Sequence, residues 1–366
     1  MSRTGVILEA ATTQAGKLMH AGVYRGKGRV EVEQVAVPEV SSGEVLIRVA
    51  ACGICGTDIK KIFHGLVEPP QILGHEIAGT VVEVGRGVTQ WKPGDRVMSF
   101  HHVPCGSCFY CERQLYSQCP GYKKTGLTAG FTPNGGGFAE YVKAMPRVAE
   151  HGIVAIPPGI TFEEATFIEP VNTMVKAVEK ARVAAREKIL VIGQGPVGLL
   201  LMMLSKLAGA IVLVSDPMAE RRSKSLQMGA DAAFDPSAGT LLDEVRAGTE
   251  GRGADCVIVA TSYAHVLSEA LAAARPGGRV LLFAQNDPVL KLEFSAAAVG
   301  IEEKEILGSY SASVDIQKSV AEMIFSRRLP VAGLVTHRFP LDRIQQALEL
   351  TARPTSESLK VLITYS

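Results

Sequence analysis

A cysteine, a histidine and a glutamate stand close together in the stretch from Gly53 to Gly79. Cys55 lies near its start, and the pair His75-Glu76 follows twenty residues later. Thiolate, imidazole and carboxylate groups are the ligands that zinc prefers, and three protein ligands leave a fourth position for water or substrate. Ligands that are divided between a turn and a distant loop suit a catalytic metal ion better than a structural one. The three residues alone are only suggestive, because a cysteine near a histidine is often a coincidence.

A second group of cysteines is far more crowded. Four of the seven cysteines lie within fifteen residues, at positions Cys105, Cys108, Cys111 and Cys119. Four thiolates in one loop make a closed tetrahedral zinc site, which has no open position and therefore serves structure rather than catalysis. The alternative is a set of buried or reactive thiols, but crowded cysteines in a reducing compartment favour a metal. Cys52 and Cys256 lie in apolar strand-like contexts and are expected in the core.

A glycine-rich turn predicts a dinucleotide site. The sequence Gly193-Gln-Gly195-Pro196-Val197-Gly198 follows an apolar strand-like run and opens a helical pattern. The glycines permit a tight turn, approach of a pyrophosphate and close helix packing, and the helix N-terminus favours the phosphates. Asp216 ends the next apolar run about twenty residues on, where a carboxylate accepts hydrogen bonds from ribose hydroxyls. A glycine turn in an unrelated α/β sheet is the alternative.

The pattern of the whole chain predicts an α/β protein with two domains. Short apolar runs separated by glycine turns fill residues 17–148 and predict an open, partly barrel-like β domain. A helix is expected from Thr161 towards Arg182, with Glu169-Pro170 inside it. Strand-like runs then alternate with helical patterns, which indicates a doubly wound parallel sheet. We expect a β-rich domain over 17–168 and 305–366, and a Rossmann domain over 169–304; residues 1–16 are expected to form a loose arm.

Composition excludes several classes of function. The 366 residues carry 38 basic and 37 acidic side chains, so the net charge of +1 gives no reason to expect nucleic acid or an anionic membrane as partner. No apolar stretch is long enough to span a bilayer, and no secretory signal is visible. Cytoplasmic localisation is therefore expected.

These motifs together resemble the zinc-dependent medium-chain alcohol and polyol dehydrogenases. The stretch GHEIAGTVVEVGRGV from Gly74 to Val88 is similar to the zinc signature of that family, and GICGTD, the four-cysteine lobe and GQGPVG follow the family order. The resemblance implies a GroES-like catalytic domain interrupted by a Rossmann domain. It also implies that Cys55 and His75 bind the catalytic zinc, that Glu76 reaches the metal in exchange with water, and that Thr57 takes the substrate proton.

The Glu169-Pro170 pair resembles the sorbitol dehydrogenase branch, where the glutamate stands at the position of a third zinc ligand. The alternative for Glu169 is a solvent-exposed residue at a helix start. One departure is Lys60, because the sorbitol and threonine branches usually carry histidine there as part of a proton path. The resemblance further places Thr173 near the nicotinamide ring. The residues expected to contact the coenzyme are Thr173, Gly193, Gly195, Pro196, Val197, Gly198, Asp216, Arg221, Phe283, Ala284 and Gln285.

The implied activity is hydride transfer between NAD and a secondary alcohol or polyol, with one catalytic and one structural zinc per chain. NAD is expected over NADP because the Asp216 carboxylate would repel a 2′-phosphate, although Arg221 and Arg222 lie nearby. Sorbitol-, butanediol- and threonine-like substrates remain open. A small-molecule substrate and a homo-oligomer, dimer or tetramer, are expected partners. The alternative function is a non-catalytic NAD-binding or sensor protein on the same scaffold.

Overall fold

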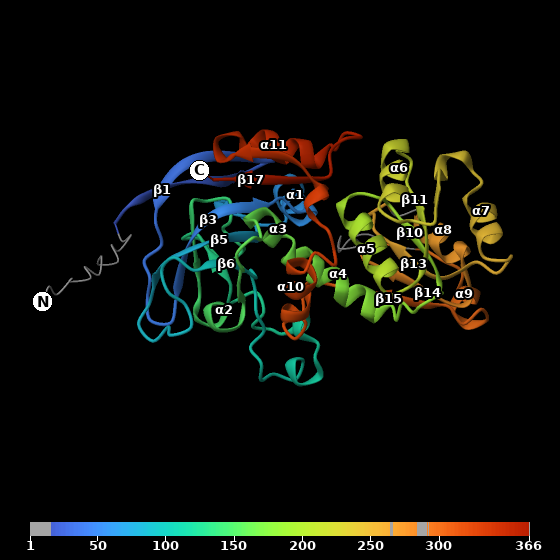
Figure 1. Ribbon diagram of the computed structural model, residues 1–366, viewed down its shortest axis with the longest axis horizontal. Coiled ribbons are helices and arrows are strands. Elements are labelled where there is room, and N and C mark those ends of the chain that lie inside the picture. The colour runs from blue at the N-terminus through green and yellow to red at the C-terminus, as the bar shows by residue number, and fades with distance from the viewer. Residues whose placement is uncertain (1–15, 264–265, 284–290, 292, 366) are drawn as a thin grey trace, which may run out of the picture. The chain divides into compact units, whose positions relative to one another are not determined.

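The computed structural model describes residues 16–263, 266–283, 291 and 293–365 (Figure 1). The chain forms two compact units. The first comprises Met1–Phe167, His337–Arg353 and Val361–Ser366, and the second comprises Ile168–Thr336 and Pro354–Lys360. Within the described ranges, no helix combines the length and the apolar character that a membrane crossing requires.

The first unit is built on two mainly antiparallel sheets. The small sheet has the order β2-β1-β4, and the large sheet has the order β16-β17-β3-β5-β6-β9, with β8 added to β3 and β7 to β8. The strands are β1 (Leu18–Gly26), β2 (Arg29–Ala36), β3 (Val45–Gly53), β4 (Gln71–Ile72), β5 (Glu76–Val84), β6 (Arg96–Ser99), β7 (Leu127–Thr128), β8 (Tyr141–Ala144), β9 (Ile153–Ala155), β16 (Val335–Pro340) and β17 (Lys360–Thr364).

Strand β3 organises the large sheet. Its first half pairs with β8 and its last three residues pair with β17, while β5 runs along its whole length. Two register shifts in the β3–β5 pair bend the sheet, because a bulge increases local twist. The sequence of β3 is apolar almost throughout, and both its faces are largely buried. The expected partly barrel-like β domain is therefore confirmed.

Four helices and three short 3₁₀ helices, among them η5 (Leu341–Arg343), complete the described part of the first unit. They are α1 (Gly56–Phe63), α2 (Pro146–His151), α3 (Phe162–Thr166) and α11 (Ile344–Ala352), with η1 (Cys111–Arg113) and η2 (Tyr116–Gln118) in the cysteine-rich loop. Only two residues separate the end of β3 from helix α1, so the end of this strand determines where the helix starts.

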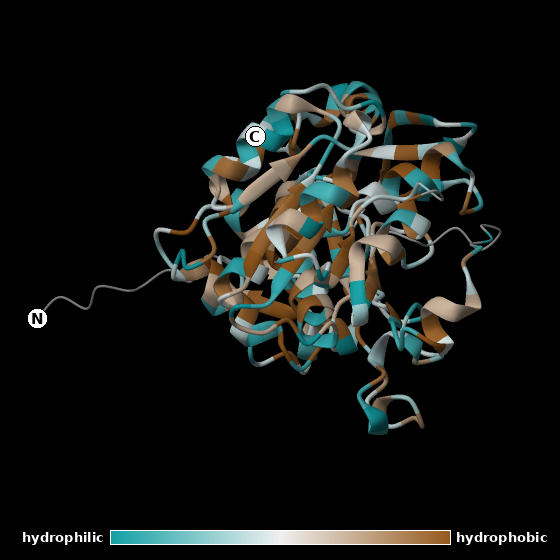
Figure 2. Cartoon of the chain, turned by 90° about the vertical axis from the view of Figure 1, so that its right-hand side faces the viewer, coloured by the Kyte–Doolittle hydropathy of each residue, from teal (hydrophilic) through white to brown (hydrophobic). Residues whose placement is uncertain are grey.

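The second unit is a doubly wound parallel sheet with the strand order β12-β11-β10-β13-β14-β15. Its strands are β10 (Lys188–Ile192), β11 (Ile211–Ser215), β12 (Ala232–Phe234), β13 (Ala254–Val259), β14 (Ala274–Leu282) and β15 (Glu305–Gly308). Its helices are α4 (Ile168–Lys180), α5 (Pro196–Leu207), α6 (Ala219–Gln227), α7 (Leu241–Gly248), α8 (Val266–Ala273), α9 (Ala296–Gly300) and α10 (Gln317–Phe325). Figure 2 shows hydrophobic strands inside and more hydrophilic helices around them. The predicted Rossmann fold is confirmed.

The helix expected from Thr161 to Arg182 is two helices. Thr161 caps α3, since its hydroxyl accepts the Glu164 N–H while the Glu164 carboxylate accepts the Thr161 N–H. The first helix ends at Thr166, and α4 begins at Ile168. Pro170 has no N–H to donate to the carbonyl of Thr166, so the hydrogen-bond ladder of one continuous helix is interrupted there.

The second unit extends further along the chain than residue 304, where we expected the Rossmann domain to end. Residues 305–308 form β15, which pairs with β14 at the edge of the parallel sheet. The unit then continues through α10 to Thr336 and takes in Pro354–Lys360. Parallel pairing between distant segments leaves no local sequence signal, so the sequence alone does not predict that this edge strand belongs to the parallel sheet.

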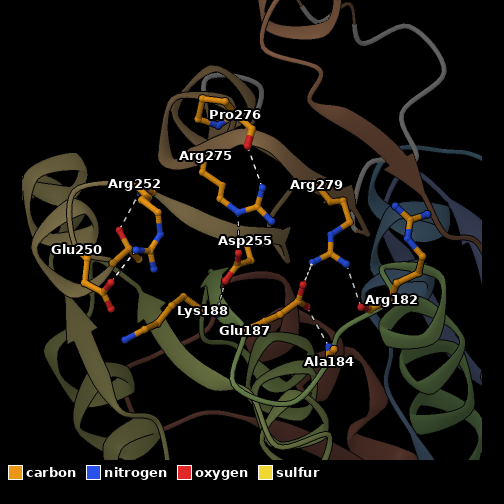
Figure 3. A network of polar contacts seen from close by, with 12 residues as sticks. Arg182, Ala184, Glu187, Lys188, Glu250, Arg252, Asp255, Arg275, Pro276 and Arg279 are labelled. Atoms are coloured by element: carbon orange, nitrogen blue, oxygen red, sulfur yellow. Dashed lines mark hydrogen bonds and ion pairs between the residues drawn. The ribbon is translucent and has the colours of Figure 1, made fainter.

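A polar network joins the amino-terminal ends of the parallel strands (Figure 3). The Arg279 guanidinium donates 2.9 Å hydrogen bonds to the carbonyls of Ala181 and Arg182 and pairs with Glu187. The Asp255 carboxylate accepts the Nε–H of Arg275 at 2.6 Å and the N–H of Lys188 at 2.7 Å. Side chains from β13 and β14 therefore hold the start of β10, at the opposite end from its glycine-rich turn.

Replacement of Arg279 should destabilise the second unit. Arg279 is only 7% exposed. Arg279→Met removes the partner of Glu187 and of two carbonyls, so we expect a loss of about 2–3 kcal/mol in the free energy of unfolding. The matched control is Arg252→Met, because the Arg252–Glu250 pair is exposed and such pairs contribute at most about 1 kcal/mol. Equal unfolding free energies for the two variants would contradict this role.

Candidate zinc centres and coenzyme site

The buried carboxylate of Asp58 organises the first candidate metal centre. Its Oδ2 accepts the backbone N–H of Cys55 at 3.1 Å, and its Oδ1 accepts that of Gly74 at 3.3 Å and contacts His75 Nδ1 at 3.1 Å. Cys55 is the N-cap of α1, and its Sγ accepts the Thr57 N–H at 3.5 Å. The start of α1 and the residues before β5 are thereby joined.

The structure brings Cys55, His75 and Glu76 together. The ligand atoms of these three residues all lie within 4.8 Å of one another. Because His75 Nδ1 faces Asp58, the other ring nitrogen is left for a metal, which is the usual arrangement for a metal-binding histidine. Burial lowers the pKa of His75, but the charge of Asp58 and its hydrogen bond to the ring raise it well above its ordinary value. Sulfur, nitrogen and oxygen donors at this separation fit zinc.

The other residues expected near the catalytic centre lie on two helices. Thr57 is half-buried in the first turn of α1, two residues after Cys55. Glu169 and Thr173 lie on α4 of the second unit, where the Thr173 hydroxyl donates to the Pro170 carbonyl at 2.7 Å. Glu169 is 4% exposed, so the alternative of a solvent-exposed residue at a helix start is wrong. A charged group is buried only with partners, which is consistent with a functional role.

The four cysteines of the loop also come together. The ligand atoms of Cys105, Cys108, Cys111 and Cys119 lie within 4.8 Å of one another. The Cys105 N–H donates to Cys119 Sγ at 3.3 Å, and a hydrogen bond from the Ser107 backbone lowers the pKa of the Cys105 thiol to about 6. Four sulfurs at this separation fit a closed tetrahedral zinc site. Cys52 and Cys256 are fully buried, as expected of core cysteines.

Some residues near the first centre were not predicted. Asp58 lies three residues after Cys55, a spacing that matches a capping box and could have revealed it. The His101 ring lies 4.7 Å from the His75 ring, between centroids. The adjacent histidines His101 and His102 carry no metal-ligand spacing, and only the pairing of distant segments brings them to the centre.

The glycine-rich turn in the second unit has the geometry of a phosphate-binding loop. It follows β10 and opens α5, as predicted. Gly193 has φ +92°, and a Cβ at Gly198 would lie 1.7 Å from the Gly193 carbonyl oxygen, so both positions require glycine. A Cβ at Gly195 would meet only the Arg221 guanidinium, at 3.8 Å. The backbone at Gly195 is therefore open for the approach of a pyrophosphate.

Asp216 lies directly after β11 and is 3% exposed. Its Oδ2 accepts the Gln194 N–H and its Oδ1 accepts the Met218 N–H, at 2.7 and 2.8 Å. The Arg221 Nη1 lies 3.9 Å from the Asp216 Oδ2. The buried Nε of Arg221 has no hydrogen-bond partner among the described residues. Phe283 directly follows β14, is half-buried and donates its N–H to the Val259 carbonyl. The expected contacts Ala284 and Gln285 lie outside the described residues.

Comparison with known proteins agrees with this geometry. Residues 41–158 match the family model of the alcohol dehydrogenase GroES-like domain, and residues 196–326 match that of zinc-binding dehydrogenases. Sorbitol dehydrogenase of Bacillus subtilis is 31% identical over 94% of this chain and 97% of its own length. L-threonine 3-dehydrogenase of Pyrococcus furiosus is 32% identical over 87% of this chain and 91% of its own length. The solved structure of alcohol dehydrogenase TADH from Thermus sp. ATN1 has a TM-score of 0.84 at 30% identity, over 94% of this chain and 99% of that one.

A GroES-like unit with clustered zinc donors, followed by a Rossmann unit, defines a zinc-dependent dehydrogenase that uses a nicotinamide coenzyme. The chain belongs to the zinc-dependent medium-chain alcohol dehydrogenase family. It is accordingly an oxidoreductase that acts on alcohols or polyols.

The two cysteine-containing centres should respond differently to substitution. We expect Cys55→Ser to keep the fold, lose one zinc equivalent and abolish turnover, because it removes a ligand at the catalytic centre. We expect Cys105→Ser to lower stability or assembly, because it leaves three crowded thiolates without a closed metal site. Metal analysis and thermal unfolding of both variants distinguish these effects. Normal zinc content and activity in Cys55→Ser would contradict the catalytic assignment.

Proposed function

We propose that this enzyme oxidises a secondary hydroxyl of a polyol or hydroxy-amino acid with NAD. The observation that carries the proposal is the convergence of Cys55, His75 and Glu76 on one point of the first unit. The relatives named for sorbitol and L-threonine support this class, because both molecules carry secondary hydroxyls.

Each residue of the first centre has a distinct task. Cys55 and His75 would hold the zinc, and Glu76 would bind it in exchange with water. When bound, zinc supplies a Lewis acid that lowers the pKa of a coordinated hydroxyl. The Thr57 hydroxyl would accept the substrate proton while it gives up its own, in the helical turn whose first N–H groups are ordered by Cys55 and Asp58. Asp58 holds the His75 ring in the orientation that presents its outer nitrogen.

The direct test is a panel of polyols, hydroxy-amino acids and simple secondary alcohols, read by the absorbance of NADH. We expect reduction of NAD by at least one secondary alcohol and none by the Cys55→Ser variant. Zinc-loaded protein that binds NAD but reduces none of it with any member of the panel would favour the alternative, a non-catalytic coenzyme-binding protein.

We assign Glu169 as a direct or water-linked partner of the catalytic zinc. The Glu169→Gln variant keeps the shape of the side chain and removes its charge. Activity and zinc affinity should therefore both fall, by about 10–100-fold. Glu163→Gln is the control, because Glu163 lies on α3 and pairs with Arg338 at the surface of the first unit. Wild-type kinetics and zinc affinity in Glu169→Gln would remove Glu169 from the site.

NAD is the proposed coenzyme. The Asp216 carboxylate can accept hydrogen bonds from the ribose diol and would repel a 2′-phosphate. Arg221 lies beside the glycine turn and would stack on the adenine. Asp216→Ser should raise kcat/KM for NADP relative to NAD, chiefly by removing repulsion. Steady-state kinetics with both coenzymes tests this. Wild-type enzyme with equal or better kcat/KM for NADP would show that the arginines decide the choice.

We also propose that the enzyme is a cytoplasmic homo-oligomer that acts on a small molecule and binds neither nucleic acid nor a membrane. The expectation of an oligomer follows from the family. Sedimentation velocity of the zinc-loaded protein tests it, with a dimer or tetramer expected, and a monomer at micromolar concentration would contradict it.

A further inference from the structure

Two neighbouring strands of the parallel sheet are each followed by an aspartate. Asp216 directly follows β11, and Asp235 directly follows β12. The last residues of these two strands, Ser215 and Phe234, are paired with each other. The Asp216 N–H donates to the Phe234 carbonyl at 3.3 Å, so the strands stay together one residue further. Both aspartates therefore stand at the carboxyl edge of the sheet, where a Rossmann fold binds the ribose of its coenzyme.

The side chain of Arg222 joins these two aspartates. Its Nη1 donates to the Asp216 carbonyl at 2.7 Å and to the Pro217 carbonyl at 2.9 Å. Its Nη2 lies 3.0 Å from the Asp235 Oδ2. The Asp235 Oδ1 accepts the Ser237 N–H at 2.9 Å. The hydrogen bonds from Ser237, together with the charge of Arg222, hold the pKa of Asp235 below its ordinary value, so this carboxylate is ionised at neutral pH.

Arg221, the preceding residue of α6, has different surroundings. Consecutive side chains on a helix are about 100° apart around its axis. A Cβ at Gly195 would lie 3.8 Å from the Arg221 Nη1, which places this guanidinium beside the glycine-rich turn. Arg221 therefore lies at the phosphate-binding turn, whereas Arg222 is bound to Asp235.

The choice between NAD and NADP depends on the charge beside the 2′ position of the ribose. A carboxylate repels a 2′-phosphate, whereas an arginine binds it through paired, charge-assisted hydrogen bonds. Arg222 contacts the backbone of Asp216, so it is close enough to the ribose site to supply such bonds. Its two terminal nitrogens are already engaged, one by two carbonyls and the other by Asp235.

We propose that Asp235 sets the coenzyme preference without touching the coenzyme, by holding Arg222 away from the 2′ position of the ribose. This inference rests on the proposed NAD-dependent function and adds a positioning residue to it. Asp216 repels a 2′-phosphate, and Asp235 keeps Arg222 from attracting one. Both carboxylates must therefore be removed before the enzyme uses NADP well.

The first experiment measures the coupling between the two aspartates. The Asp235→Asn variant keeps an oxygen for the Ser237 N–H but turns towards Arg222 an amide nitrogen, which cannot accept a hydrogen bond. The ratio of kcat/KM for NADP to kcat/KM for NAD is measured in the wild type, in Asp216→Ser, in Asp235→Asn and in the double variant. We expect the double variant to raise this ratio about 10-fold more than the product of the two single effects. Single effects that simply multiply overturn the inference.

The extra gain must also depend on Arg222. Addition of Arg222→Met to the double variant should remove it, and a gain that survives this change would overturn the inference by assigning the phosphate to Arg221. Asp243→Asn is the control, because it removes the same charge from an exposed pair with Arg246 on α7. This control should leave the ratio unchanged, alone and in combination with Asp216→Ser.

The second experiment measures binding without turnover. Adenosine 5′-monophosphate and adenosine 2′,5′-bisphosphate differ only in the 2′-phosphate, and each is titrated into the zinc-loaded enzyme by calorimetry. We expect the wild type to prefer the monophosphate. The double variant should gain affinity for the bisphosphate about 10-fold beyond the product of the single effects, and Arg222→Met should remove that gain.

The two experiments together separate the inference from the proposed function. The expected binding without oxidation of any alcohol would contradict the dehydrogenase function and leave the role of Asp235 intact. Normal oxidation of an alcohol with NAD, together with binding effects that simply multiply, would overturn the role of Asp235 and leave the dehydrogenase function intact.

Discussion

The site in the first unit depends on one fully buried carboxylate. Asp58 is 0% exposed, and it is held by the N–H groups of Cys55 and Gly74 and by the ring of His75. A charged group so deep in the protein is tolerated only when its lone pairs are satisfied, since an unpaired one costs several kcal/mol. The start of α1 and the entry to β5 must therefore meet at Asp58. The positions of two proposed zinc ligands, Cys55 and His75, follow from that requirement.

From this point the contacts extend outwards to the rest of the first unit. His101 contacts His75, His102 pairs with Gly126, and Tyr122 packs on the cysteine cluster. Side-chain contacts therefore connect the cysteine loop with His75. In the second unit, the glycine turn after β10 has the geometry of a phosphate-binding loop, while the Arg279 network holds the other end of the same strand.

The sequence predicts those features of the fold and the site that depend on the spacing of residues close together in the chain. The Rossmann fold and the need for glycine at Gly193 and Gly198 follow from a strand, a tight turn and a helix within a dozen residues, and the Thr161 cap follows from a four-residue pattern. Contacts between distant segments were not predictable in this way. The ring contacts that lead from His75 through His101 and His102 to Tyr122 join residues that are far apart in the sequence. The same holds for the pairing of the edge strand β15 with β14. The periodicity of apolar residues along the chain does not predict such contacts.

The zinc affinity of the Asp58→Asn variant tests the central claim most directly. Asparagine keeps the size of the side chain, but its amide nitrogen cannot accept a hydrogen bond. It also lacks the negative charge with which Asp58 balances His75. In a titration with a chelator, one zinc equivalent should be released at a concentration about 10–100-fold below that for the wild type, while the zinc of the cysteine cluster stays bound. Release of both equivalents at wild-type chelator concentrations would contradict the account, because Asp58 would then not be what positions the ligands.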